Sequence, residues 1–180
     1  MLCLFGFDRV GVAVCDLYFL DPEPEPGQEG GEQGVRLEVR VLERGPLPGS
    51  AYSAQPVEVS TPVWRADLLE SVANPGSLDR AHHHPRFDGW EPGRRHFDDA
   101  LTADPVAWVG RRLADLDQLV AAAGVAPDVL GPDDAAAVRD AVPEIVATIE
   151  RLLDRARAAG YGQPGRAPAP GPGGARFGWL

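Results

Sequence analysis

The segment VRLEVRVLER, residues 35–44, decides the fold class of this chain. From Val35 to Val41 an aliphatic residue stands at every second position, and Arg36, Glu38 and Arg40 stand between them. A period of two predicts a half-exposed β-strand with one apolar and one polar face. We therefore expect a sheet that rests on a core with one face only.

Further strands are predicted on both sides of this one. Residues 10–20 are rich in β-branched and aromatic side chains at both parities, which indicates a central strand covered on both faces. Residues 50–60 and 63–72 predict a third and a fourth strand, separated by Pro62. Short connections favour an antiparallel meander. The acidic run 21–34, rich in Pro and Gly, predicts a mobile loop.

The period becomes helical after residue 102. Thr102 or Asp104 is a suitable cap for a helix that ends at Gly124, and a second helical region extends from residue 132 to 160. Pro143 is expected to kink or split that region. The sequence thus predicts an α+β domain over residues 1–160, with about four mainly antiparallel N-terminal strands packed on two or three C-terminal helices. Residues 161–180 form a Pro/Gly-rich tail, expected to be disordered.

Composition excludes several functions. All 17 basic residues of the 180 are arginine, so lysine Schiff-base chemistry and Walker-type phosphate binding are ruled out. The net charge of -10 disfavours broad binding to nucleic acid or to anionic membranes. Asp8 and Arg9 interrupt the apolar N-terminal run, so we expect neither a signal peptide nor a membrane span, and a cytoplasmic location. Cys3 and Cys15 are expected to be buried thiols.

Residues that can carry out chemistry are concentrated in the segment 79–99, DRAHHHPRFDGWEPGRRHFDD. All four histidines lie between His82 and His96, among four arginines and several acids. Pro and Gly residues predict a long irregular connection between the sheet and the helices, the kind of loop that often carries function.

One interpretation of this segment is a site for a divalent transition metal. Neutral imidazoles and carboxylates are ligands of such ions, and the candidates are His82, His84, His96 and Asp98. Adjacent residues of an extended segment point to opposite sides, so His82 and His84 are the two consecutive histidines that can share a face.

A second interpretation is metal-free cleavage of RNA or a phosphodiester, because histidines flanked by arginines supply acid–base and anion-stabilising groups. Its candidate residues are His84, His96, Arg94 and Arg65. Residues 52–99 are faintly similar to small ribonuclease-type toxins of bacterial toxin–antitoxin pairs. No diagnostic motif of those toxins matches, so no catalytic residue is transferred.

A third interpretation assigns the segment no chemistry: it is an ordered structural loop, or a surface that binds a protein partner. Trp and Arg are common interface anchors, so the candidates are Trp90 and Arg95, together with Trp179 and Leu180 of the tail. Beside the segment, Arg65 and Asp67 are expected on one strand face, either as an ion pair or as the lining of a pocket beneath the histidines.

The runs MLCLFGFDRVGVAVCDLYFLDPEPEPGQEG, VRLEVRVLERG, PVWRADLLES and HHHPRFDGWEPGR resemble a family of uncharacterised actinobacterial proteins. The resemblance covers most of residues 1–123 and implies an intracellular protein of unknown function. From the residues themselves we predict a non-enzymatic interaction or accessory protein that acts through the 79–99 segment. The alternative is a small metal- or His-dependent hydrolase; oligomeric state is left open.

Overall fold

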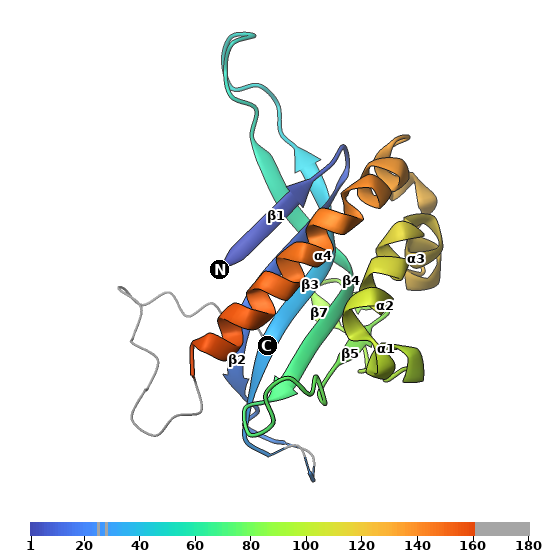
Figure 1. Cartoon of the computed structure of the whole chain (residues 1–180). Coiled ribbons are helices and arrows are strands. Elements are labelled where there is room, and N and C mark those ends of the chain that lie inside the picture. The colour runs from blue at the N-terminus through green and yellow to red at the C-terminus, as the bar shows by residue number, and fades with distance from the viewer. Residues whose placement is uncertain (25, 28, 161–180) are drawn as a thin grey trace.

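The computed structural model describes residues 1–24, 26–27 and 29–160, which form an antiparallel sheet followed by helices (Figure 1). Five strands pair in chain order, each with its sequence neighbour. The strands are β1 (Leu2–Gly6), β2 (Val10–Leu20), β3 (Gly31–Arg44), β4 (Val57–Ser71) and β5 (His82–His84). Two further strands, β6 (Phe87–Asp88) and β7 (Glu91–Pro92), make a separate small hairpin. The predicted α+β class is confirmed.

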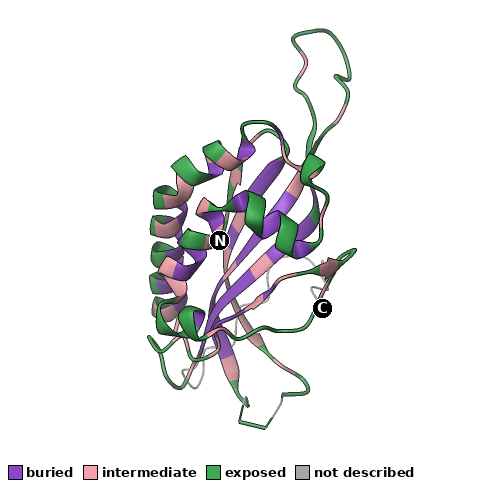
Figure 2. Cartoon of the chain, turned by 90° about the vertical axis from the view of Figure 1, so that its right-hand side faces the viewer, coloured by how far each residue is buried: buried purple, intermediate pink, exposed green. Residues whose placement is uncertain are grey.

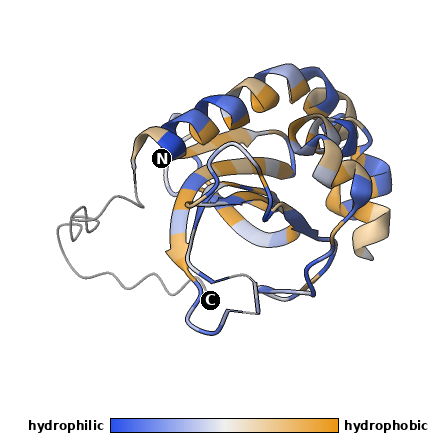
Figure 3. Cartoon of the chain, turned by 60° about the horizontal axis from the view of Figure 1, so that its bottom comes forward, coloured by the Kyte–Doolittle hydropathy of each residue, from blue (hydrophilic) through white to orange (hydrophobic). Residues whose placement is uncertain are grey.

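The helices follow the strands and cover one face of the sheet (Figure 1). They are α1 (Asp99–Ala103), α2 (Pro105–Ala114), α3 (Leu116–Ala123) and α4 (Asp134–Ala158), with a 3-10 turn η1 (Pro127–Val129) before α4. Helix α4 packs over β2 and β3, whereas α2 and α3 contact β4. Hydrophilic and hydrophobic residues alternate around α4, so that its outer side is polar (Figure 3). None of these helices is long and apolar enough to span a membrane.

The pairing register gives the sheet two chemically different faces. Val12 stands opposite Val39, and Val14 opposite Leu37, and all four belong to the core that the helices bury. Much of the sheet is buried (Figure 2). The residues between them on β3, which include Arg36 and Arg40, lie on the other face. The alternation predicted for residues 35–41 therefore sets the apolar core on one side and a polar face on the other. The prediction of a half-exposed strand was wrong, because Glu38 and Arg40 on the polar face are buried as well.

The strand count differs from the four predicted. Leu2–Gly6 pairs with β2 as an edge strand, and His82–His84 pairs with β4 as a fifth strand. The segments 50–60 and 63–72 are not two strands, because β4 continues through Pro62. The register shifts between Val39 and Leu42, opposite this proline, so the missing N–H group falls at an irregularity of the ladder.

Strand β3 begins at Gly31, inside the run predicted to be a mobile loop. Gly34 explains why the strand can start there. Its φ is +150°, and a Cβ atom at this position would lie 2.2 Å from the carbonyl oxygen of Leu68. Only a glycine allows β4 to approach this closely. The neighbouring Glu32 and Gln33 are buried.

The helix boundaries also differ from the prediction. Residues 105–123 form two helices, because Asp115 leaves the helical conformation and accepts a hydrogen bond from the Gln118 N–H as the cap of α3. Helix α3 ends, as predicted, at Gly124 in the left-handed conformation. Helix α4 continues past Pro143 without a break. Pro143 lies on its exposed side, where water can serve the carbonyl that loses its partner.

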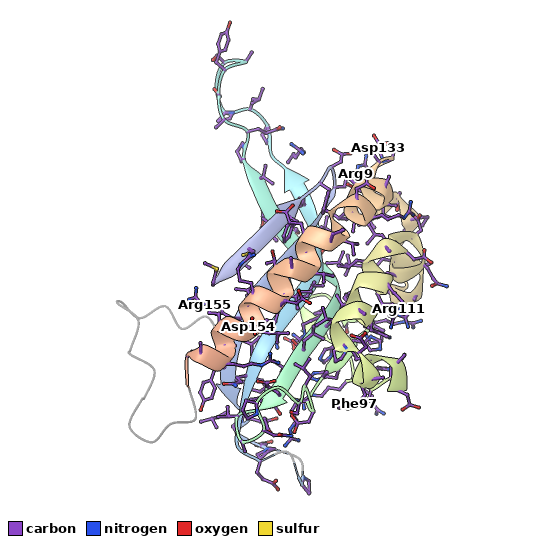
Figure 4. All side chains as sticks on the ribbon, in the orientation of Figure 1. Arg9, Phe97, Arg111, Asp133, Asp154 and Arg155 are labelled. Carbon is purple, nitrogen blue, oxygen red and sulfur yellow. The ribbon has the colours of Figure 1, made fainter. Side chains whose placement is uncertain are left out.

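A buried carboxylate holds the N-terminal end of α4 against the sheet. Asp134 is 1% exposed and accepts hydrogen bonds from the N–H groups of Asp8 at 2.8 Å, Arg9 at 3.1 Å and Gly131 at 2.7 Å. Arg9 lies beside this end of α4 in Figure 4. The turn between β1 and β2 is thereby joined to a residue more than 120 positions later in the chain.

A second buried carboxylate holds the C-terminal end of α4. Glu70 on β4 is fully buried and accepts hydrogen bonds from the Arg157 guanidinium, with Nε at 3.1 Å and Nη2 at 3.0 Å. The Gly76 N–H and the Gln33 side chain also donate to it. Burial alone would raise the pKa of the Glu70 carboxyl, but these donors and the charge of Arg157 bring that pKa below its ordinary value.

Candidate metal centre

The register between β4 and β5 places two histidines beside an aspartate. His82 stands opposite Asp67, and His84 stands opposite Arg65. Because side chains alternate along a strand, these four residues share the face of the sheet that the helices do not cover. The pairing of His82 with His84 on one face agrees with the prediction from sequence.

The three side chains converge at Asp67. The Nε2 atom of His82 lies 3.4 Å, and the Nε2 atom of His84 3.5 Å, from the same carboxylate oxygen, Oδ2 of Asp67. One potential ligand atom from each residue lies within 4.8 Å of the other two. All three residues are buried.

Backbone carbonyls fix the orientation of both rings. The Nδ1 atom of His82 is 2.8 Å from the Arg80 carbonyl oxygen, and that of His84 is 2.6 Å from the Gly93 carbonyl oxygen. A carbonyl oxygen only accepts, so each Nδ1 carries the hydrogen and donates it. In a neutral ring the Nε2 lone pair then points toward Asp67. Histidines that bind metals are usually held by this kind of hydrogen bond from the opposite nitrogen.

The spacing suits a bound cation better than direct hydrogen bonds. A lone pair that faces a carboxylate oxygen at 3.4–3.5 Å is repelled unless positive charge lies between the two atoms. Ligands that are about 2.1 Å from a tetrahedral ion are separated from one another by about 3.4 Å. The two distances from Nε2 to Oδ2 of Asp67 therefore match the separation that such an ion requires.

Two arginines share the carboxylate with the histidines. The Nε atom of Arg36 donates to Oδ1 of Asp67 at 2.7 Å, and the Nε atom of Arg65 lies 3.0 Å from Oδ2. Burial alone would raise the pKa of Asp67. Hydrogen bonds that His82 and His84 donate when their rings are doubly protonated, together with the charges of the two arginines, more than offset burial, so this pKa lies well below its ordinary value. Asp67 is therefore an ionised carboxylate.

Arg65 supplies positive charge at the position that an ion would take. Its Nη2 atom lies 3.0 Å from Nε2 of His84, within hydrogen-bonding distance of the lone pair that a metal would use. Metal binding at His84 thus requires this guanidinium to move. Burial lowers the pKa of Arg65, which is the direction expected for a cation with few acidic partners.

Aromatic side chains of the β6–β7 region surround the centre. The Arg65 guanidinium lies 6.0 Å from the Phe87 ring, and the Phe97 ring lies 5.7 Å from that of His82. Glu38, which stands opposite Arg65, is paired as well, since Arg40 donates to it at 2.6 Å, and Arg40 lies 5.0 Å from the Trp90 ring. The polar face is thus organised into ion pairs partly covered by this hairpin.

His83 and His96 lie on the opposite side of β5 and do not join the centre. Their backbones form an isolated bridge, and their ring centroids are 5.7 Å apart. His83 packs against Trp108, at 4.9 Å between centroids. Burial, with smaller contributions from His96 and Arg112, lowers the pKa of His83 to about 4. The ring of His83 is therefore neutral near pH 7.

The remaining candidates from the sequence are dispersed. Asp98 caps α1 by accepting the Ala100 N–H at 2.7 Å, so it is not a ligand beside His82. Arg94 is exposed, and Arg95 pairs with Asp21 at 3.6 Å. Trp90 is 56% exposed at the hairpin.

Of the interaction candidates, Trp179 and Leu180 lie outside the described residues.

Because His96 and Asp98 lie elsewhere, the candidate ligand set consists of His82, His84 and Asp67. Asp67 had been expected beside Arg65 but not among the ligands, because the sequence does not give the register of β5 on β4.

No family model, curated protein or solved structure matches this chain. The resemblance to an actinobacterial family therefore stays a prediction, and any functional proposal depends on the geometry of the site.

Proposed function

We propose that this chain is a metal-binding protein whose centre consists of Asp67, His82 and His84. The observation that carries the proposal is the arrangement of the two rings: both Nδ1 atoms are bound to carbonyl oxygens, and both Nε2 atoms face Oδ2 of Asp67 at 3.4–3.5 Å. Such an arrangement suits a cation held between the two Nε2 atoms and the carboxylate of Asp67.

The donor set limits the choice of metal. Two imidazoles and one carboxylate suit Zn²⁺, Fe²⁺ or Mn²⁺, whereas Ca²⁺ and Mg²⁺ prefer oxygen ligands. Three protein ligands leave at least one coordination position for water or for another molecule. A metal ion with an open position can polarise a substrate or activate a bound water, so a hydrolase is the enzyme class that the centre would support.

The test is metal binding by the untagged, full-length protein after removal of metals with a chelator. Titration with Zn²⁺ or Co²⁺ should give one ion per chain, and Co²⁺ should produce the visible absorption of a site with nitrogen and oxygen ligands. His82→Ala and His84→Ala should each abolish this binding, because each removes one of three ligands. His96→Ala is the matched control, since His96 lies on the other side of β5, and it should bind as the wild type does.

Two results would contradict this function. One is the failure of folded wild-type protein, verified by circular dichroism, to bind Zn²⁺ or Co²⁺ above trace levels. The other is equal loss of binding in His96→Ala and His82→Ala, which would place the ion elsewhere in the histidine segment.

A second candidate function, protein–protein interaction, is favoured by the aromatic residues at the surface of the same segment. Trp90 is 56% and Phe97 58% exposed, and exposed aromatic side chains next to arginines are common interface anchors. Affinity purification with wild type, Trp90→Ala and a Tyr52→Ala control tests it. A stoichiometric partner lost only with Trp90→Ala would support this function, and identical sets of co-purified proteins would contradict it.

A further inference from the structure

We propose that the exogenous ligand of the metal centre is a small oxyanion, a carboxylate or a phosphate, that binds the ion through one oxygen and Arg65 through another. The inference rests on the proposed metal-binding function and names the chemical class of molecule that this centre binds.

The first step of the argument is charge. With a divalent ion in place, the single carboxylate of Asp67 faces the ion and the guanidinium groups of Arg36 and Arg65. Glu38, which stands opposite Arg65 on β3, is already bound to Arg40 at 2.6 Å. Buried positive charge without compensation is unfavourable by several kcal/mol per ion, by an order-of-magnitude argument. An anionic ligand supplies the missing negative charge, whereas a neutral ligand does not.

The second step is the position of Arg65. Its Nη2 atom lies 3.0 Å from the Nε2 atom of His84, which the ion must approach to about 2.1 Å. The guanidinium therefore moves and loses its acceptor when the ion binds. It stays nearby, because its Nε atom is 3.0 Å from Asp67 and its Cζ atom is 6.0 Å from the centre of the Phe87 ring. An N–H donor without an acceptor then lies next to the open coordination position.

The third step is access. The side chains of Arg36 and Arg65 are 21% and 13% exposed, those of His82 and His84 4% and 5%, and that of Asp67 1%. The two arginines are therefore the most exposed side chains of the cluster. A molecule that reaches the ion passes guanidinium groups, which attract anions and match the paired oxygens of a carboxylate or phosphate.

The experiment measures the coupling between metal and anion. Co²⁺ affinity of the chelator-treated, untagged protein is determined in a non-coordinating buffer alone and with acetate, inorganic phosphate or acetamide. Acetamide has nearly the shape of acetate without its charge. We expect acetate or phosphate to tighten Co²⁺ binding by about tenfold or more and acetamide to leave it unchanged. Because linkage is reciprocal, Co²⁺ should tighten anion binding by the same factor.

Two arginine variants test the role of Arg65. Arg65→Met keeps most of the side-chain volume and should still bind Co²⁺, but the anion should no longer tighten that binding. Arg65→Lys keeps the charge without the two-pronged donor and should retain part of the effect. Arg94→Met removes an exposed arginine of the same segment, and we expect it to behave as wild type.

The outcomes separate the two proposals. Absence of Co²⁺ binding by the wild type overturns the metal-binding function itself. Co²⁺ binding that is equally tight with and without acetate or phosphate overturns the oxyanion ligand and leaves the metal centre standing. An anion effect that persists in Arg65→Met, or that Arg94→Met also removes, overturns the assignment to Arg65.

Discussion

The imidazole rings of His82 and His84 meet nearly edge to face, with centroids 5.1 Å apart and an interplanar angle of 72°. Both rings direct Nε2 at one oxygen of Asp67. The Asp67 carboxylate on β4 is thus the group that both histidines of β5 face. Whatever cation balances it, the charge of Asp67 is central to this network, and its removal has a predictable effect on stability.

Asp67→Asn should destabilise the metal-free protein by about 3–5 kcal/mol, the usual effect of removing one partner of a buried ion pair. The substitution keeps the shape of the side chain and leaves Arg36 and Arg65 facing a neutral amide. Urea unfolding followed by circular dichroism measures the difference. Asp88→Asn, at an exposed aspartate of β6, should change stability by less than about 0.5 kcal/mol. Equal effects of the two substitutions would contradict a central role for Asp67.

Glu70→Gln should make stability less sensitive to acid. The pKa of Glu70 is below its ordinary value in the folded protein, so its charge stabilises the fold above the unfolded pKa of about 4.3. This contribution is lost as the pH falls through the lower, folded pKa. Urea unfolding between pH 7 and pH 3 should therefore show wild type and variant farthest apart above about pH 5 and converging in acid. Glu144→Gln, at an exposed position of α4, should follow the wild-type curve, and a gap for Glu70→Gln that does not narrow in acid would refute the prediction.

Asp134→Asn should weaken the attachment of α4 to the turn between β1 and β2. The amide that replaces one carboxylate oxygen cannot accept the N–H bonds that now reach it, and each buried N–H left without an acceptor costs about 1–3 kcal/mol. Thermal and urea unfolding measure the loss. Asp133→Asn changes the adjacent, exposed residue, whose side chain makes no capping bond, and should have little effect. Indistinguishable stabilities of the two variants would show that the buried carboxylate does not hold the helix.

Gly34→Ala should destabilise the sheet by about 3 kcal/mol or more, because it combines a strained backbone with a clash. The φ of +150° disfavours any side chain, and the new Cβ atom would lie 2.2 Å from the Leu68 carbonyl oxygen. Gly6→Ala is the control within the same sheet, since its Cβ atom would meet only ordinary contacts at 3.6 Å. Equal unfolding midpoints in urea for Gly34→Ala and Gly6→Ala would contradict the close approach of β3 and β4.

Within residues 1–160, limited digestion with chymotrypsin should cut first after Tyr52. The chain from 45 to 56 extends away from the body of the protein, and Tyr52 is 98% exposed (Figures 1 and 2). Exposed loop tips are preferred sites of cleavage. Mass spectrometry should detect two fragments that remain together on a sizing column. First cleavage after Tyr18, which lies partly buried in β2, would contradict the exposed position of the arm.

The sequence predicted the α+β class because its periodicities are strong. Alternation at residues 35–41 separated a core face from a polar face, and helical spacing located the helices that cover the core. Two strands of the five-stranded sheet were missed for physical reasons. Leu2–Gly6 is too short and uniformly apolar to show a period, and three histidines have no strong strand preference of their own. Their strand character comes from pairing with β2 and β4.

The candidate centre was predictable in part. Alternation placed Arg65 with Asp67, and His82 with His84, each on one strand face. The residues between β4 and β5 are irregular, and Leu78 even has a positive φ of 48°. The side-chain alternation of a strand cannot be extended across an irregular segment, so the register that brings His82 opposite Asp67 could not be derived from the sequence. The same limitation explains why His96 and Asp98 were grouped with the ligands.

The order of the strands has a consequence for how the chain folds. Each strand pairs with its sequence neighbour, so most sheet contacts close short loops and should form early. The contacts of Asp134 with Asp8 and of Arg157 with Glu70 span more than 80 residues each. We therefore expect a meander that assembles first and a last helix that docks afterwards, so that changes at these two carboxylates mainly speed unfolding and leave the refolding rate nearly unaltered.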